Sequence, residues 1–293
     1  MLGIQRQVHI VHTALNVKLQ EDLERLLRDV FGAETYYKDY SEELDRDAAL
    51  VLIGEMCIEP LSKRFNLEPV GSAKWIKTNG QRFHSVAFKI EDVRQADAHL
   101  AKSGLKRYYT NPEYRDVFFL TEPEESFNAV FEFCRVEMPN DPRIKPGWSA
   151  DKWRDEHPLG IEKLSSISSV VRDLDEAAIL YGDAFGFQPL GQRDLEGEGA
   201  RVAAYWAGES IFELMQPTTR RTPLDDCLRL RGEGWYAVNF KVKSAKKAAA
   251  YLKSHGLRLI GDEQSRFIID PQDTFDAVYG FTQDEIPGDP RAE

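Results

Sequence analysis

The sequence predicts an α+β fold in which four β-α-β-β-β modules pair into two domains. Two observations predict this fold. One pattern, a strand-like run followed by an amphipathic helix and a glycine, occurs four times, starting near His12, His84, Ser166 and Tyr236. Short runs rich in β-branched and aromatic residues follow each helix, as expected of strands.

The predicted helices have recognisable ends. In "HTALNVKLQEDLERLLRDVFGAE" the helical pattern stops at Gly32. In "SISSVVRDLDEAAILYGDAFGFQ" Asp173 is a candidate N-cap and Gly186 ends the pattern. A short polar side chain favours a helix start and a glycine favours its end, so both segments read as strand followed by helix.

The strand-like runs between the helices complete the modules. They are "AETYYKDY", "AALVLIG" and "MCIEPL" in the first, and "LKRYYT", "RDVFFLTEP" and "NAVFEFCRV" in the second. The third includes "ARVAAYWAG" and "SIFELMQP", and the fourth includes "SRFIID" and "DAVYGFT". Two such modules can form a curved mixed sheet around a cavity, with the helices outside.

A longer repeat sets the predicted domain boundaries. "MPNDPR" begins at Met138 and "IPGDPR" at Ile286, and each closes a pair of modules. The stretch between the pairs is rich in Pro, Gly and charge, which is typical of a linker. We therefore expect a first domain at 1–138, a linker at 139–160, a second domain at 161–285 and a tail at 286–293.

Composition excludes several classes of partner. The chain has 293 residues, a formal net charge of −11 and three cysteines without metal-site spacing. An acidic surface disfavours nucleic acid and anionic membranes. With no apolar run long enough to cross a bilayer and no secretory leader pattern, we expect a reduced, cytoplasmic protein.

Two histidines and two glutamates recur at similar module positions. Glu59 follows His12 by 47 residues, and Glu132 follows His84 by 48 residues. Because strand side chains alternate between faces, equivalent positions should point the same way, which places all four in one cavity. Imidazole and carboxylate ligands suit a divalent ion such as Zn²⁺, Ni²⁺, Co²⁺, Mn²⁺ or Fe²⁺.

The second half lacks this set. Its equivalent positions are Ser166, Glu213, Tyr236 and Gly280. We therefore expect the first half to hold the working site and the second to be a metal-free copy. By the same alternation, His9 should face away from the cavity.

At this point the sequence resembles the vicinal oxygen chelate superfamily, which includes glyoxalase I, methylmalonyl-CoA epimerase, bleomycin resistance proteins and extradiol dioxygenases. "SVVRDLDEAAILYGDAFGFQPLG" is similar to that family's opening strand and helix, and "SIFELMQP" to its closing strand. The resemblance implies glyoxalase-like domains with metal ligands on the first and last strands of each module. Carried over, these ligands are His12, Glu59, His84 and Glu132.

The resemblance also implies a reaction type. A metal ion in this superfamily stabilises an enolate-like intermediate, and an adjacent carboxylate moves the proton. Here Glu132 is the expected base, with Glu59 as the interchangeable second catalytic carboxylate. We expect an isomerase, epimerase or lyase acting on a small oxygenated substrate, and a homodimer is compatible with the family.

Two other functions stay open. One is an Fe²⁺ or Mn²⁺ dioxygenase of an aromatic diol that uses His12, His84 and Glu132. The ring-cleaving relatives, however, usually carry two histidines and one glutamate in the second half, which this sequence lacks. The other is a metal-free protein that binds or sequesters a small molecule.

Overall fold

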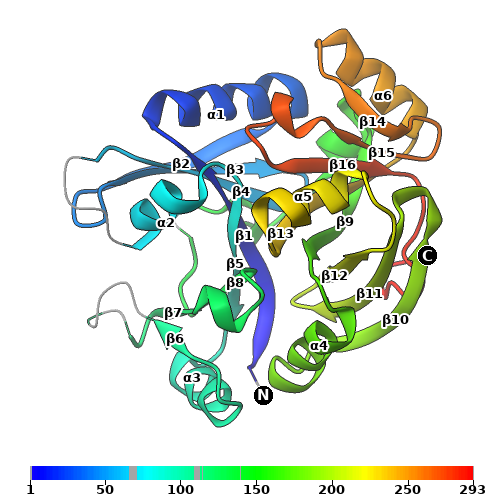
Figure 1. The fold of residues 1–293 in the computed structure, drawn as a ribbon. Helices are drawn as coiled ribbons and strands as arrows, with labels where there is room; N and C mark the ends of the chain where they lie inside the picture. The colour runs from blue at the N-terminus through cyan, green and yellow to red at the C-terminus, as the bar shows by residue number, and fades with distance from the viewer. Residues whose placement is uncertain (1, 66–70, 109–112, 114, 139, 293) are drawn as a thin grey trace.

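The computed structural model describes residues 2–65, 71–108, 113, 115–138 and 140–292, and two eight-stranded mixed sheets organise the chain (Figure 1). The first has the strand order β2-β3-β4-β1-β5-β8-β7-β6, and the second has β10-β11-β12-β9-β13-β16-β15-β14. Subtracting eight from each strand number of the second sheet reproduces the first. The predicted α+β fold of duplicated modules is therefore confirmed.

The first sheet and its helices span β1 to β8. Their bounds are β1 (Ile4–Ala14), α1 (Val17–Phe31), β2 (Glu34–Ser41), β3 (Arg46–Ile53), β4 (Met56–Lys63), α2 (Gly71–Asn79), β5 (Phe83–Ile90), α3 (Val93–Lys102), β6 (Arg107–Tyr108), β7 (Phe118–Thr121) and β8 (Val130–Cys134). The end of the predicted strand "LKRYYT", at 109–110, lies outside the described residues. Helix α2 has no counterpart in the predicted module.

The second sheet repeats this order. Its elements are β9 (Ile161–Val170), α4 (Leu174–Ile179), β10 (Gln188–Leu195), β11 (Ala200–Ala207), β12 (Ser210–Pro217), α5 (Pro223–Arg231), β13 (Gly234–Val242), α6 (Ala245–Ser254), β14 (Leu259–Asp262), β15 (Arg266–Ile269) and β16 (Val278–Thr282). Short 3-10 turns lie at Pro123–Glu125, Pro142–Ile144, Glu196–Glu198 and Pro271–Asp273, and π-helical turns at Lys152–Glu156 and Leu180–Ala184.

The helix ends follow the local sequence. The side chain of Asn16 accepts from the Leu19 amide and caps α1, and Gly32 ends it with φ of 64°. Asp173 caps α4 by accepting from two amides, as predicted. A left-handed residue at a helix end suits glycine, which has no Cβ to clash. These caps fix where each opening strand passes into its helix.

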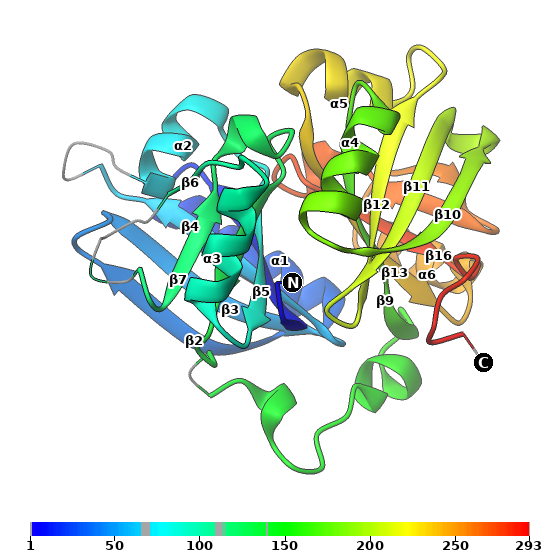
Figure 2. The ribbon, with the colours of Figure 1, turned by 90° about the horizontal axis from the view of Figure 1, so that it is seen from below.

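The two halves share one core. Aromatic rings meet across them: Phe88 lies 5.2 Å from Phe212, and Phe131 lies 5.0 Å from Trp235, between ring centroids. The segment before β9 loops away from the sheets and returns (Figure 2). Its buried Trp153 donates from Nε1 to the carbonyl of Phe31, at 3.1 Å. This contact ties the segment to the end of α1.

Among the described residues, no helix has both the length and the apolar character needed to span a membrane.

Candidate functional site

A cavity of about 330 Å³ opens in the first half, between side chains of β1, β3, β4, β5 and β8. Three of the four predicted site residues line it, namely Glu59, His84 and Glu132. The fourth, His12, does not. The polar wall of the cavity also contains His9, Asp39, Arg46, Ser72 and Ser85.

The predicted position of His12 is wrong. Its imidazole is fully buried between the two halves, where Nδ1 lies 3.0 Å from the Tyr279 hydroxyl. Nε2 lies 3.0 Å from the Phe275 carbonyl oxygen. Both ring nitrogens are therefore engaged with the second half, and His12 is a structural residue of that contact.

Strand register explains the error. In the parallel pair β1–β4, Val11 lies opposite Glu59, so the residues of β1 that share the face of Glu59 are odd-numbered. The β1–β5 ladder also shifts between Ile10 and His12. The prediction that His9 faces away is therefore also wrong, and His9 takes the place assigned to His12.

One signal in the sequence could have found His9. Aligned on the helix N-caps, His9 precedes Asn16 by seven residues, and Ser166 precedes Asp173 by seven residues. His9 is thus the counterpart of Ser166. Arg46 and Ser85 had no comparable signal, because a lone arginine or serine in a strand is usual.

His9 and Glu59 form a buried ion pair, with Nε2 and Oε2 2.9 Å apart. Burial by itself lowers the pKa of His9, but the attraction and hydrogen bond of Glu59 outweigh it, and the net shift is upward. Burial likewise works against a charged Glu59, yet His9, followed by Arg46 and His84, lowers its pKa. Each group therefore favours the charged form of the other.

Glu132, on β8, has a different environment. Burial raises its pKa, the charge of His9 opposes this, and the charge of Glu59 adds to it. No hydrogen bond from a described residue contributes to this shift of the Glu132 pKa. A buried carboxyl of this kind holds a proton more readily than Glu59, so the two acids of the cavity differ in basicity.

His84 completes the set from β5. Its ring packs edge-on against Trp75 of α2, with centroids 4.6 Å apart, and its Nδ1 lies 2.9 Å from the Ser85 hydroxyl. Burial lowers its pKa to about 4, although the charge of Glu59 opposes the shift. His84 is therefore neutral at pH 7, the form in which imidazole binds metals.

The equivalent place in the second half holds a different polar cluster. The Ser166 hydroxyl donates to Glu213 at 2.5 Å, and Arg193 forms an ion pair with the same carboxylate. Asn239 donates to the Ser166 oxygen at 3.1 Å. A side chain at Gly280 would meet the Asn239 Oδ1 at 2.2 Å. No imidazole takes part, and the polar groups satisfy one another.

The donor types in the first cavity fit a divalent cation. Two imidazoles and two carboxylates suit Zn²⁺ and its first-row neighbours. The buried Nδ1 of His9 has no hydrogen-bond partner. No three His, Cys, Asp or Glu side chains of the described chain, however, stand in a geometry that could hold an ion. A bound ion would require at least one of these side chains to rotate.

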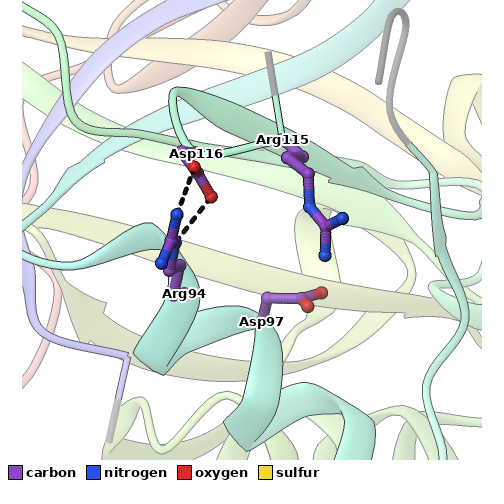
Figure 3. Close-up of a pocket in the computed structure, with 4 residues that line it drawn as sticks. All are labelled: Arg94, Asp97, Arg115 and Asp116. Carbon is purple, nitrogen blue, oxygen red and sulfur yellow. Dashed lines mark hydrogen bonds and ion pairs between the residues drawn. The ribbon is translucent and has the colours of Figure 1, made fainter. Parts of the chain in front are cut away.

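A larger hollow on the surface lacks such chemistry. Figure 3 shows this space of about 420 Å³, lined by Arg94, Asp97, Arg115 and Asp116. Arg94 binds Asp116 at 2.5 Å, and Asp97 binds Arg107 at 2.7 Å. The exposed Arg94–Asp116 pair is of a common and weak kind, and Asp97 is engaged by the partly buried Arg107. The first-half cavity remains the candidate site.

Comparisons with known proteins agree with the fold. Residues 167–269 match the family model described as Glyoxalase/Bleomycin resistance protein/Dioxygenase superfamily. A mutant of 4-hydroxymandelate synthase from Streptomyces coelicolor aligns over 95% of this chain and 92% of its own, with 14% identity and a TM-score of 0.65. No curated protein sequence matches.

Two smaller structures align with part of the chain. Methylmalonyl-CoA epimerase from Mycobacterium tuberculosis has 23% identity over 42% of this chain and 87% of its own, with a TM-score of 0.38. A hypothetical protein from Bacillus halodurans has 24% identity over 45% of this chain and 97% of its own, with a TM-score of 0.39. The predicted resemblance is thus confirmed: residues 167–269 match the Glyoxalase/Bleomycin resistance protein/Dioxygenase superfamily, and the whole chain has the fold of 4-hydroxymandelate synthase.

Proposed function

We propose that this protein is an enzyme that moves a proton on a carbon next to a carbonyl group of a small oxygenated substrate, in the first-half cavity. One observation carries the proposal. A buried ion pair, His9–Glu59, and a second buried carboxyl, Glu132, line the same cavity with His84. The outcome would be an isomerisation, an epimerisation or a lyase-type addition.

Glu132 is the proposed base. A carboxyl whose pKa is raised by burial accepts a proton from carbon more readily than an ordinary one. His9 keeps Glu59 charged and oriented, and Arg46 adds a positive charge near Glu59 at 3.5 Å. Apolar side chains such as Leu50 and Leu61 complete the walls and limit water at the reacting carbon.

The proposal includes a divalent metal ion, held by His9, Glu59, His84 and Glu132. When bound, such an ion supplies Lewis-acid stabilisation of negative charge on the substrate oxygen. His9 replaces His12 in this ligand set because only His9 faces the cavity. The metal identity stays open among Zn, Ni, Co, Mn and Fe.

Metal analysis with matched variants tests the proposal. We expect the purified protein to contain close to one divalent ion per chain, and the metal-free protein to take up Co²⁺. His9→Ala should abolish both, whereas Ser166→Ala, its counterpart in the second half, should change neither. An unchanged metal content in His9→Ala would refute the ligand set.

Proton exchange tests the reaction itself. Small 2-hydroxy and 2-oxo acids incubated in D₂O with the metal-loaded protein should exchange the hydrogen next to the carbonyl carbon, as followed by NMR. Glu132→Gln should stop this exchange. Exchange at the wild-type rate in that variant would remove Glu132 from the role of base.

An oxygen-dependent reaction is the second candidate, favoured by the whole-chain likeness to 4-hydroxymandelate synthase. It would use His9, His84 and Glu132 as two imidazoles and one carboxylate, a set typical of non-haem Fe²⁺ oxygenases. Oxygen uptake by the Fe²⁺-loaded protein with a catechol would favour this reaction over proton transfer. A protein without metal in either test would instead fit a binding role.

A further inference from the structure

We propose that Arg143 is a positioning residue for the first-half cavity, because it holds the irregular stretch of β1 that directs His9 toward Glu59. The positioning role itself follows from the geometry, and its effect on metal binding rests on the proposed function. Arg143 belongs to the repeated Asp-Pro-Arg motif, which lies outside the cavity and has no other assigned role.

The guanidinium of Arg143 joins two strands that carry site residues. Nη2 donates to the carbonyl of Val8 at 2.7 Å, directly before His9 in β1. Nη1 donates to the carbonyl of Glu55 at 3.0 Å, in the turn that leads into β4 and Glu59. One planar guanidinium therefore holds both the backbone before His9 and the backbone that leads to Glu59.

The contact falls where the regular strand pairing is interrupted. The β1–β5 register shifts between Gln7 and His9, and the pairing of β1 with β4 starts only at Ile10. Such bulges re-aim side chains and are common beside active sites. Arg143 supplies a donor to the Val8 carbonyl at this break and so stabilises the conformation that turns His9 into the cavity.

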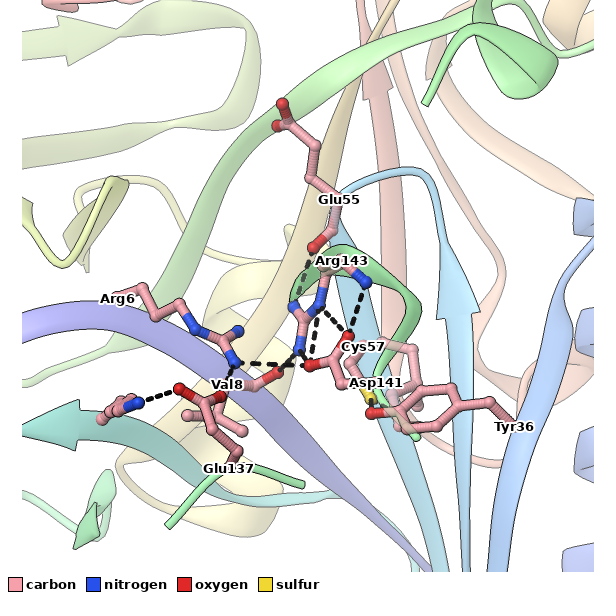
Figure 4. A network of polar contacts seen from close by, with 10 residues as sticks. Arg6, Val8, Tyr36, Glu55, Cys57, Glu137, Asp141 and Arg143 are labelled. Carbon is pink, nitrogen blue, oxygen red and sulfur yellow. Dashed lines mark hydrogen bonds and ion pairs between the residues drawn. The ribbon is translucent and has the colours of Figure 1, made fainter. Parts of the chain in front are cut away.

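A buried carboxylate holds Arg143 in place, as Figure 4 shows. Asp141 accepts from Arg143 Nε at 3.0 Å and from Nη2 at 2.8 Å, and also caps the Arg143 amide at 2.9 Å. Arg6 lies 3.4 Å from the same carboxylate and also forms an ion pair with Glu137 at 2.5 Å. A two-point bond between guanidinium and carboxylate gives the fork a defined orientation.

The second half contains a similar arrangement on its opening strand. Arg291 donates to the carbonyl of Leu164 at 3.0 Å and to that of Ser165 at 3.3 Å, beside the shift that precedes Ser166. Asp289 accepts from Arg291 Nε at 3.0 Å. Lys163 takes the place of Arg6, 3.0 Å from Asp289. The carboxylate anchor and the bond to the opening strand match. Both carbonyl acceptors of Arg291, however, lie in β9, whereas Arg143 also reaches the turn before β4.

This duplication supplies a matched control. Arg143→Lys and Arg291→Lys each keep the positive charge and remove the fork from an equivalent bulge. Both should lower the melting temperature by a similar amount if the motif only stabilises the fold. Only Arg143→Lys should alter the site, because groups that orient metal ligands typically change metal affinity by about 10- to 100-fold when they are replaced.

The experiment uses the full-length protein and two measurements. The first is the ¹H–¹³C NMR signal of the His9 ring in the metal-free protein, assigned by its loss in His9→Gln. The second is the affinity for Co²⁺ and the visible spectrum of the Co²⁺ complex. We expect Arg143→Lys to shift the His9 signal, to weaken Co²⁺ binding at least tenfold and to alter the spectrum, and Arg291→Lys to leave all three as in the wild type.

The outcomes separate this inference from the proposed function. If both variants shift the His9 signal equally, or neither does, the positioning role of Arg143 is wrong. If the wild type takes up no Co²⁺, the proposed metal site fails, but the His9 signal still decides the role of Arg143. Should Arg143→Lys not fold, Asp141→Asn paired with Asp289→Asn provides the same comparison with a milder change.

Discussion

The two halves of the molecule place different chemistry on one scaffold. Both have the same strand order, and both carry a glutamate at the same position of the closing strand, Glu59 or Glu213. In the first half His9 pairs with that glutamate and a cavity remains. In the second half Arg193 and Ser166 bind the equivalent glutamate instead.

This comparison shows that the glutamate alone does not define a site. Glu213 is buried more deeply than Glu59, and its partners are a guanidinium and a hydroxyl, which satisfy its charge without an imidazole. What distinguishes the first half is the neutral imidazole of His84 and the second carboxyl of Glu132 around an open space. The candidate chemistry therefore depends on the neighbours of the shared residue.

The largest expected effect is on catalysis in the first half. Glu132→Gln should lower kcat about 10²- to 10⁴-fold, the range for loss of a general base. Its control is Glu213→Gln, which should leave metal content and kcat unchanged. Steady-state kinetics on the substrate found by proton exchange would check both, and a kcat loss in Glu213→Gln would mean that the choice of half is wrong.

The next effect is on stability in the second half. Glu213→Leu should cost about 3 kcal/mol of unfolding free energy, because it leaves Arg193 without its buried partner. Denaturant unfolding would measure the loss. Replacing Arg193 by Met in the same chain should restore part of the lost stability. If no stability is recovered, the unpaired Arg193 is not the cause of the loss.

The contact between the halves should be sensitive to acid. Burial lowers the pKa of His12 to about 4 from 6.5, although the Phe275 carbonyl and Asp276 oppose the shift. The unfolded chain then binds the proton more readily, so stability is complete above pH 6.5 and falls toward pH 4, by up to about 3 kcal/mol. His12→Gln should reduce the slope of the stability profile between these values, while buried His84, whose pKa is also lowered to about 4, still contributes. An unchanged slope would contradict the assignment.

The smallest expected effect comes from the two equivalent turns that face the other half. Gly54 and Gly208 both have φ of 55°. An added Cβ at Gly54 would lie 3.5 Å from Ile161, but at Gly208 it would lie 2.8 Å from Ile4. Gly54→Ala should cost about 1 kcal/mol from the left-handed backbone alone, and Gly208→Ala about 1 kcal/mol more. Thermal unfolding would compare them, and equal losses would show that the close approach at Gly208 relaxes freely.

Much of the site could be predicted from the sequence because the repeat carries positional information. Glu59, His84 and Glu132 line one cavity as predicted, since each occupies a strand position set by the module. His12 could not be placed correctly by its distance from Glu59 alone. A one-residue slip changes the face of every side chain, and the shift between Ile10 and His12 is invisible in the sequence.

The sequence by itself determined the duplicated α+β fold, because apolar periodicity, N-caps and helix-ending glycines act over a few residues. Spacing in the sequence was compatible with either His9 or His12 as the cavity residue, and the tertiary structure decided between them. It also decided that Arg193 pairs with Glu213 in the second half and that Arg143 bonds the carbonyl before His9. Register, ion pairing and contacts between halves depend on residues far apart in the chain, so local pattern cannot specify them.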